Sequence, residues 1–313
     1  MTVPAGIPRP LRPARPGSGP TARQRAFAER AAKTVLRRRF MNGLTTVIVG
    51  LAALLTTLPL VFILFYLVRE GASAVSVGFF THMPKPVGEA GAGMANAIVG
   101  TLILIGLASL IGLPIGIGAG LYLAEYGRSR FANGVRFLAD VLNGLPSIVV
   151  GIFAWQFLVK PLSHFSAMAG GVALAALMVP MITRTTEEMV LLVPTALREA
   201  ALALGYSRAR TAVSVVLRTA TAGIVTGVLV AVARIAGETA PLLFTAFGNS
   251  FWSVRLDEPV SALPLQIFYY AISPYDEWHA LAWAGALVLI VIVFIISVAA
   301  RIATRARFSG GHD

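Results

Sequence analysis

The stretch that decides the fold runs from Glu187 to Glu238 and reads EEMVLLVPTALREAALALGYSRARTAVSVVLRTATAGIVTGVLVAVARIAGE. Its first half is charged, contains Pro194 and Gly205, and separates two apolar runs. Its second half is an apolar segment that carries Arg234 and Glu238. A polar connection followed by an apolar helix with internal charges is typical of a membrane protein with a functional site inside the bilayer.

The composition of the whole chain supports this class. Of 313 residues, 57% are hydrophobic and only 13% are charged, whereas about 25% are charged in a soluble domain. A helix needs about 20 apolar residues to cross a bilayer. We therefore predict an all-α membrane protein with six transmembrane helices, at residues 44–68, 96–122, 137–158, 168–185, 219–247 and 280–300.

The distribution of positive charge predicts the orientation. With the N-terminus in the cytoplasm, 21 of the 26 lysines and arginines lie in cytoplasmic segments, four lie outside, and Arg234 lies within the membrane. This bias predicts a multi-pass protein of the cell (plasma or inner) membrane with both termini cytoplasmic. It also accounts for the net charge of +12 without nucleic-acid binding.

The N-terminal segment and the absence of catalytic motifs bound the function further. Residues 1–40 are rich in proline and arginine, which predicts a disordered basic cytoplasmic tail before the first transmembrane helix at 41–70; a basic surface helix at 23–39 is the alternative. The chain has no cysteine, four isolated histidines and no phosphate-loop, HExxH or GxSxG motif. We expect no catalytic residue, no metal ligand and no cofactor site, so that energy comes from an ion gradient or a partner.

The connection between the fourth and fifth spans predicts a short helix that docks on a partner protein. Pro194 suits the first turn of a helix, Gly205 suits its left-handed C-cap, and Ser207 can cap the next helix. The side chains of Arg198 and Glu199 point away from an apolar stripe. That stripe consists of Leu197, Ala200, Ala201 and Leu204.

Arg234 and Glu238 lie one helical turn apart in the fifth span. A buried charge costs about 3 kcal/mol inside a membrane, and pairing offsets that cost. Two interpretations fit: a salt bridge that fixes helix packing, or a guanidinium that binds an oxyanion in a path. Thr239 lies where Pro241 is expected to break the helix.

Two further features accompany the spans. Asn143 and Ser147 flank a predicted kink at Pro146 in the third span and are candidate neighbours of a path. Three glycines recur every four residues in the second span, which favours close helix packing over pore lining. They are Gly112, Gly116 and Gly120.

The sequence Glu199-Ala200-Ala201, followed by Gly205 and by Val215-Val216-Leu217, resembles the EAA motif of ABC importer permeases. The resemblance implies a type I ABC importer permease fold, a permease domain at residues 95–303 and a cytoplasmic coupling segment at residues 187–218. It further implies a non-catalytic subunit whose partner ATPase binds ATP and Mg²⁺. Arg218 replaces the proline of the motif, so we expect a different entry into the fifth span. The implied coupling residues are Pro194, Leu197, Glu199, Ala200, Ala201, Leu204 and Gly205.

The block RIAGETAPLL at residues 234–243 resembles the permeases of phosphate-specific ABC importers. The resemblance implies that Arg234 and Arg184 contact phosphate on its way through, although positive-inside placement explains Arg184 equally well. Glu238 would position Arg234 and keep the site from holding the anion too tightly. The implied partners are a homologous second permease, a dimer of ATPase subunits and an extracytoplasmic phosphate-binding protein, which would contact the loop between Trp252 and Trp278.

Three other functions remain open from the sequence. The first is a permease for another oxyanion, namely molybdate, sulfate or phosphonate. The second is an ion-coupled secondary anion transporter, which would also use intramembrane charges but would need no EAA motif. The third is a scaffold or sensor that reports transport to a regulator.

Overall fold

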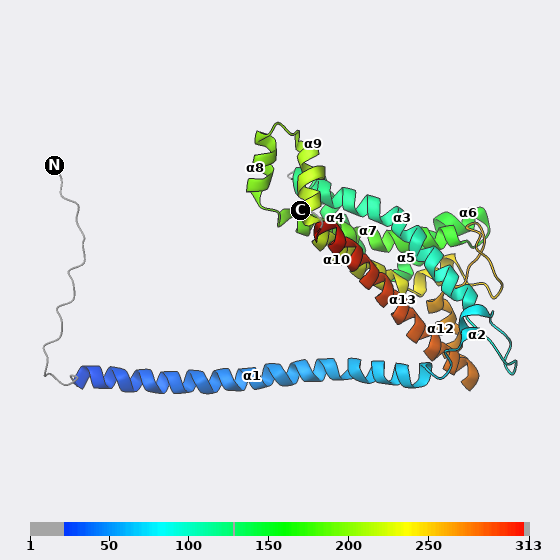
Figure 1. Ribbon diagram of the computed structural model, residues 1–313, viewed down its shortest axis with the longest axis horizontal. Helices are drawn as coiled ribbons and strands as arrows, with labels where there is room; N and C mark the ends of the chain where they lie inside the picture. Colours follow the sequence, from blue (N-terminus) through cyan, green and yellow to red (C-terminus); the bar gives the residue numbers. More distant parts are fainter. Residues whose placement is uncertain (1–21, 128, 310–313) are drawn as a thin grey trace. The chain divides into compact units, whose positions relative to one another are not determined.

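The computed structural model describes residues 22–127 and 129–309, where the regular elements are helices (Figure 1). The chain divides into two units, residues 1–64 and 65–313. The described part of the first unit belongs to α1 (Ala22–Gly71), which includes the basic stretch and continues through the first predicted span. Of the predicted disordered tail at residues 1–40, residues 1–21 lie outside the described part, and residues 22–40 belong to α1. A helix, which was the alternative over residues 23–39, replaces the disordered tail there.

Among the described residues, five helical segments are long and apolar enough to cross a membrane. They belong to α1, to α3 (Ala95–Tyr126), to α7 (Ala167–Leu191), to the continuous helical segment Arg208–Ala236 that ends with α10 (Leu217–Ala236), and to α13 (Asp276–Ser309). A sixth span is present if the bent pair of helical segments Arg130–Gly144 and Ser147–Leu162 counts as one crossing. The membrane-spanning segments of those five helices are Arg38–Gly71, Ala95–Tyr126, Ala167–Leu191, Arg208–Ala236 and Asp276–Ile302.

The third predicted span is broken rather than straight. Helix α4 (Arg130–Gly144) is followed after Pro146 by α5 (Ser147–Ala154), and the two segments meet at 104°. The second arm continues through a π-helical turn, η1 (Trp155–Val159), into α6 (Lys160–Leu162). Proline has no N–H to donate and its ring blocks the preceding helix. The predicted kink or short unwound turn in the third span is therefore confirmed, and the span extends from residue 130 to residue 162 when the bent pair counts as one crossing.

The fifth predicted span is shifted toward the N-terminus. It begins with α9 (Arg208–Thr211) and a π-helical turn, η2 (Ala212–Val216), which run directly into α10. It ends at Ala236, and α11 (Ala240–Thr245) follows after a turn. The predicted break near Thr239 is confirmed, and the extension of this span to Phe247 is wrong. The π-helical turn lies directly before the position where Arg218 replaces the proline of the motif.

The glycines of α3 pack against α7, as the sequence predicted. A Cβ on Gly116 would lie 2.8 Å from the Cβ of Ile182, and one on Gly120 would lie 2.5 Å from the carbonyl oxygen of Thr183. Gly112 lies against Met178 in the same way. The backbones of the two helices approach so closely that side chains at these positions have no room.

This packing predicts the effect of a larger residue. We expect Gly120→Leu to reduce the free energy of unfolding by about 1–3 kcal/mol, because overpacking forces the two helices apart. Gly118→Leu on the same helix is the matched control, since nothing lies within 4 Å of a Cβ there. Thermal unfolding of the two detergent-solubilised variants compares them, and equal midpoints would contradict the packing role.

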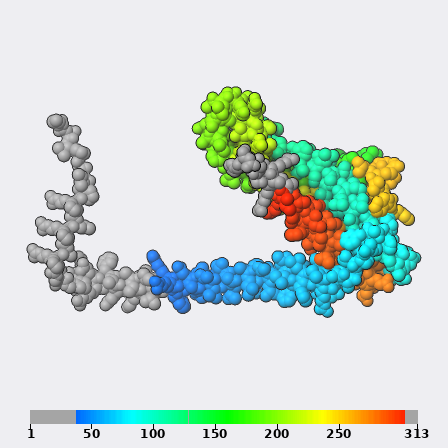
Figure 2. Space-filling model, viewed as in Figure 1, coloured from blue at the N-terminus to red at the C-terminus, as the bar shows by residue number. Residues whose placement is uncertain are grey.

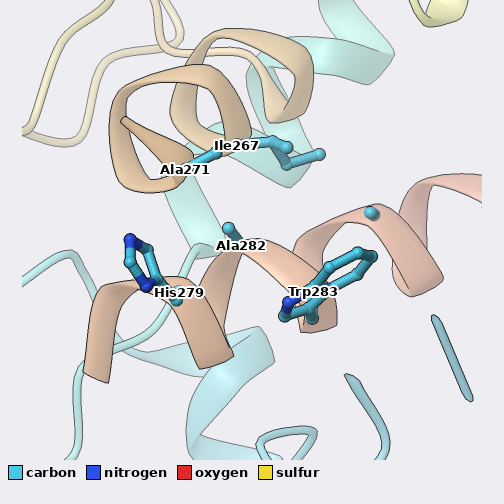
Figure 3. A pocket seen from close by; sticks show the side chains of 6 residues that line it. Ile267, Ala271, His279, Ala282 and Trp283 are labelled. Carbon is cyan, nitrogen blue, oxygen red and sulfur yellow. The ribbon is translucent and has the colours of Figure 1, made fainter. Parts of the chain in front are cut away.

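The remaining helices complete the second unit. α2 (Val77–Thr81) and α12 (Leu263–Ala271) lie at the end of the bundle opposite to α8 (Thr195–Ala203), which protrudes with α9 (Figures 1 and 2). α12 packs against the first part of α13. A cavity of about 380 Å³ between them is apolar and lined by small residues together with Ile267, His279 and Trp283 (Figure 3).

Candidate functional site

Helix α8 has the caps that the sequence predicted. Pro194 occupies the N-cap, and Gly205 has a φ of +85°, which favours glycine over residues with a Cβ. The N–H of Gly205 donates to Leu202 and that of Tyr206 donates to Ala201, which is the Schellman arrangement. Both ends of the helix are therefore sharply defined by local chemistry.

The outward face of α8 differs from the predicted stripe by one residue. Leu197, Ala200 and Leu204 are exposed, Leu204 to 80%, whereas Ala201 is buried. The carboxylate-bearing residue Glu199 is also exposed. The face available to a partner is therefore apolar with small residues and one acidic neighbour.

Arg198 attaches α8 to the rest of the protein. Its Nε donates to Glu125 of α3 at 3.0 Å, and its two terminal nitrogens donate to the carbonyl oxygens of Val190 and Val193 at 2.8 Å and 2.6 Å. The burial of Ala201 has a different cause, because α8 packs against η2 and α9. The sequence analysis did not find the pair of Arg198 and Glu125.

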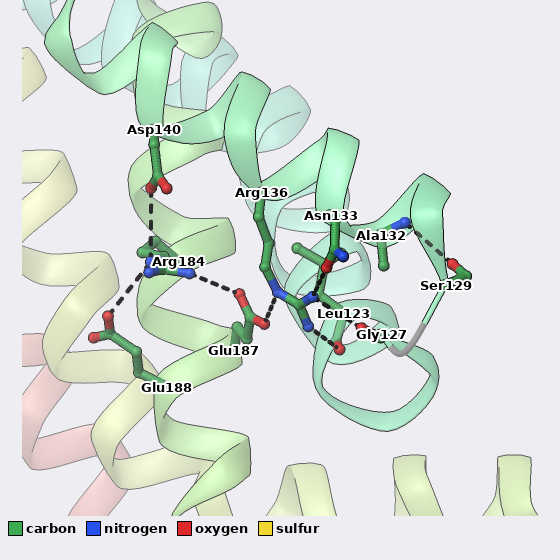
Figure 4. A network of polar contacts seen from close by, with 10 residues as sticks. All are labelled: Leu123, Gly127, Ser129, Ala132, Asn133, Arg136, Asp140, Arg184, Glu187 and Glu188. Atoms are coloured by element: carbon green, nitrogen blue, oxygen red, sulfur yellow. Dashed lines mark hydrogen bonds and ion pairs between the residues drawn. The ribbon is translucent and has the colours of Figure 1, made fainter.

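A second polar cluster lies beside it, at the contact of α4 and α7 (Figure 4). Glu187, whose side chain is 3% exposed, accepts a hydrogen bond from Nε of Arg136. Arg184 lies 3.3 Å from the same carboxylate and within 3.7 Å of Asp140 and Glu188. Two arginines and three carboxylates leave a net charge of −1 in this cluster, and Arg184, 42% exposed, is the more accessible of the two arginines.

Arg234 lies in the last turn of α10, where a cation also interacts favourably with the helix dipole. Its Nε lies 3.8 Å from Glu238, and a terminal nitrogen lies 3.5 Å from the sulfur of Met181. The side chain is 47% exposed, so the ion pair leaves donors of the guanidinium free. Met181 and Arg184 are three residues apart on α7 and share a face, which brings the two predicted path arginines to adjacent turns.

The other predicted path residues surround two helix breaks. Asn143 precedes and Ser147 follows the bend between α4 and α5, and both are half-buried. Within the described residues, the amide oxygen of Asn143 has no hydrogen-bond partner. Thr239 lies in the turn between α10 and α11. In the described part, the hydrogen bonds and ion pairs of Arg234 go to Met181 and Glu238, so Asn143 and Ser147 are not joined to it.

The two breaks lie against each other. Helix α5 packs on α11, where a Cβ on Gly151 would lie 2.6 Å from the Cα of Pro241. Broken helices free backbone polar groups, which a membrane protein tolerates only where protein or water surrounds them. This part of the bundle can therefore provide donors and acceptors to a polar solute.

The opposite end of the bundle has an exposed aromatic segment. Phe251 is 80% and Trp252 is 56% exposed, beside a cavity of about 660 Å³ that Lys85 also lines. In the same segment the hydrogen bonds from Arg255 hold the pKa of Asp257 below its ordinary value. This surface is suited to contact with another protein.

The comparisons with known proteins agree with one another. Residues 112–308 match the family described as binding-protein-dependent transport system inner membrane component. The phosphate transport system permease protein PstA of Yersinia pestis is 48% identical over 266 residues, which cover 85% of this chain and 90% of that protein. The protein of the same name from Haemophilus influenzae is 47% identical over 267 residues, or 84% of this chain and 92% of that protein.

A solved structure shares the fold. A chain of the MetNI methionine ABC transporter, in an inward-facing conformation, superposes with a TM-score of 0.54 at 19% identity. The match covers 67% of this chain and 92% of that chain. The predicted type I ABC importer permease fold is confirmed.

Proposed function

This chain belongs to the binding-protein-dependent transport system inner membrane component family, and from that membership we propose that it imports inorganic phosphate as a permease subunit. It is a multi-pass membrane protein that works with a second permease, an ATPase and a binding protein. These partners are of the PstC, PstB and PstS types, respectively. ATP and Mg²⁺ bind to the ATPase, and this chain takes no part in hydrolysis.

The observation that carries the proposal is the half-exposed guanidinium of Arg234. It lies beside the break between α10 and α11, and its Nε is 3.8 Å from the carboxylate of Glu238. An arginine fork offers parallel N–H donors that fit the oxygens of phosphate. Glu238 orients the fork and weakens its hold on the anion, so that phosphate is released rather than retained.

Arg184 continues the path toward the end that carries α8. Three carboxylates surround it, so an anion leaving Arg234 meets a second guanidinium that is already partly neutralised. The carboxylates repel the anion once it has passed. With both termini in the cytoplasm, α8 and this cluster lie on the cytoplasmic side, where phosphate is released.

Helix α8 receives the energy. Its apolar face of Leu197, Ala200 and Leu204 docks in a groove of the ATPase. Closure of the ATPase on ATP displaces α8, and the permeases then expose the path to the opposite side of the membrane. The aromatic segment around Trp252 contacts the binding protein, which delivers phosphate.

Transport by the complete complex in proteoliposomes tests this function. We expect ATP-dependent phosphate uptake that requires the binding protein, and stimulation of ATP hydrolysis by phosphate together with that protein. Molybdate, sulfate and phosphonate, each supplied with the same complex, are the comparison substrates. Uptake of one of these in preference to phosphate, or uptake driven by an ion gradient without ATP, would contradict the proposal.

A further inference from the structure

Arg198 joins α8, α3 and α7 by direct contacts, whereas the backbone connects these helices only one after another. It belongs to α8, it pairs with Glu125 of α3, and it donates to the carbonyl oxygens of Val190 and Val193 at the end of α7. The last carbonyl groups of a helix have no partner within the helix, and they carry the negative end of its dipole. The guanidinium therefore binds two buried carbonyl groups, one in the last turn of α7 and one just after it, together with one carboxylate.

Arg136 makes the reciprocal connection. It belongs to α4, it donates to the carbonyl oxygens of Leu123 and Gly127 at the end of α3, and it pairs with Glu187 of α7 (Figure 4). Each arginine thus caps one of the two long helices and binds a carboxylate of the other. The ends of α3 and α7 are crosslinked twice, once to α4 and once to α8.

The link through Arg198 matters because the backbone connection to α8 is short and bends at Pro194. Pro194 is extended and has no N–H, so no helical hydrogen bonds continue from α7 into α8 and the two helices are free to move relative to each other. Three hydrogen bonds from one planar group, which is only 19% exposed, remove that freedom. A displacement of α8 then reaches α3 and α7 directly instead of being absorbed at the connection.

We propose that Arg198 is a positioning residue that makes α8 and the ends of α3 and α7 move as one body. Glu125 is its carboxylate partner. The inference rests on the proposed function, in which α8 receives the movement of the ATPase. Arg136 brings α4, and with it Asp140, into the same body.

The test measures the number of phosphate ions transported per ATP hydrolysed by the complete complex in proteoliposomes. Arg198→Gln removes the fork but leaves the outward face of α8 intact, so the complex is expected to assemble. We expect the transport ratio to fall about tenfold, within the range typical of energetic coupling between sites. Glu125→Gln is expected to lower the ratio less, because the two bonds to carbonyl groups remain.

Two further variants complete the test. The double variant R198Q/E125Q is expected to match R198Q alone, since the two residues act through one contact. Arg130→Gln, an exposed arginine at the start of α4, is the charge-matched control and should keep the wild-type ratio.

The outcomes separate this inference from the proposed function. A wild-type ratio in assembled R198Q complex overturns the role of Arg198. If R198Q does not assemble, E125Q decides, and an unchanged ratio in that variant overturns the inference. Failure of the unmodified complex to couple phosphate uptake to ATP would instead overturn the proposed function.

Discussion

We expect Arg234→Gln to abolish phosphate uptake, while the complex with the second permease and the ATPase remains assembled. The glutamine keeps a polar side chain but loses the charge and the parallel donors that bind an oxyanion. Assembly is expected to survive because glutamine keeps a polar side chain there and the bonds of Arg234 within the described residues go to Met181 and Glu238 of the same subunit. Uptake of labelled phosphate by proteoliposomes measures the change, and co-purification measures assembly.

Two other substitutions show whether the geometry or the charge of Arg234 is needed. Arg234→Lys keeps the charge without the fork, and we expect it to restore only part of the uptake. Arg69→Gln, at the end of α1, makes the same chemical change at an arginine outside the proposed path and should leave uptake unchanged. Normal uptake by the Arg234→Gln complex would remove Arg234 from the path and leave its pair with Glu238 as a packing contact.

Local chemistry explains which parts of the site could be predicted. The ends of α8 follow from Pro194 and Gly205, because proline restricts the residue before it and glycine permits the left-handed conformation that ends a helix. The break after α10 follows in the same way from Gly237 and Pro241. Such signals need no knowledge of the remainder of the chain.

Contacts between distant segments explain what was missed. Arg136 and Glu187 are 51 residues apart, and Arg198 and Glu125 are 73 apart, so no spacing rule joins them. In a chain with 13% charged residues, however, a charge close to an apolar span has few partners to choose from. That scarcity is the signal that could have indicated these pairs. The 104° bend at Pro146 likewise depends on how α5 packs against α11. A proline in the sequence predicts a kink but not this packing or the angle that results from it.

Loss of the ATPase from the complex is the expected result of Gly205→Val. Gly205 has a φ of +85°, a conformation that a β-branched residue adopts only with strain. The substitution therefore disrupts the cap that ends α8 and displaces Leu204, which is 80% exposed and belongs to the docking face. Since nothing lies within 4 Å of a Cβ at this position, the effect comes from the backbone and not from a clash.

Gly88→Val provides a control with the same strain at a different place. Gly88 has a φ of +87° and equally open surroundings, but it lies between α2 and α3, at the end of the bundle opposite to α8. Co-purification of the ATPase with the permease pair should be normal in this variant and lost in Gly205→Val. Equal retention of the ATPase by both variants would show that α8 is not the docking helix. Loss of the ATPase from both variants would instead indicate general instability. A defect specific to the cap of α8 should appear only in Gly205→Val, because the two glycines have nearly the same φ.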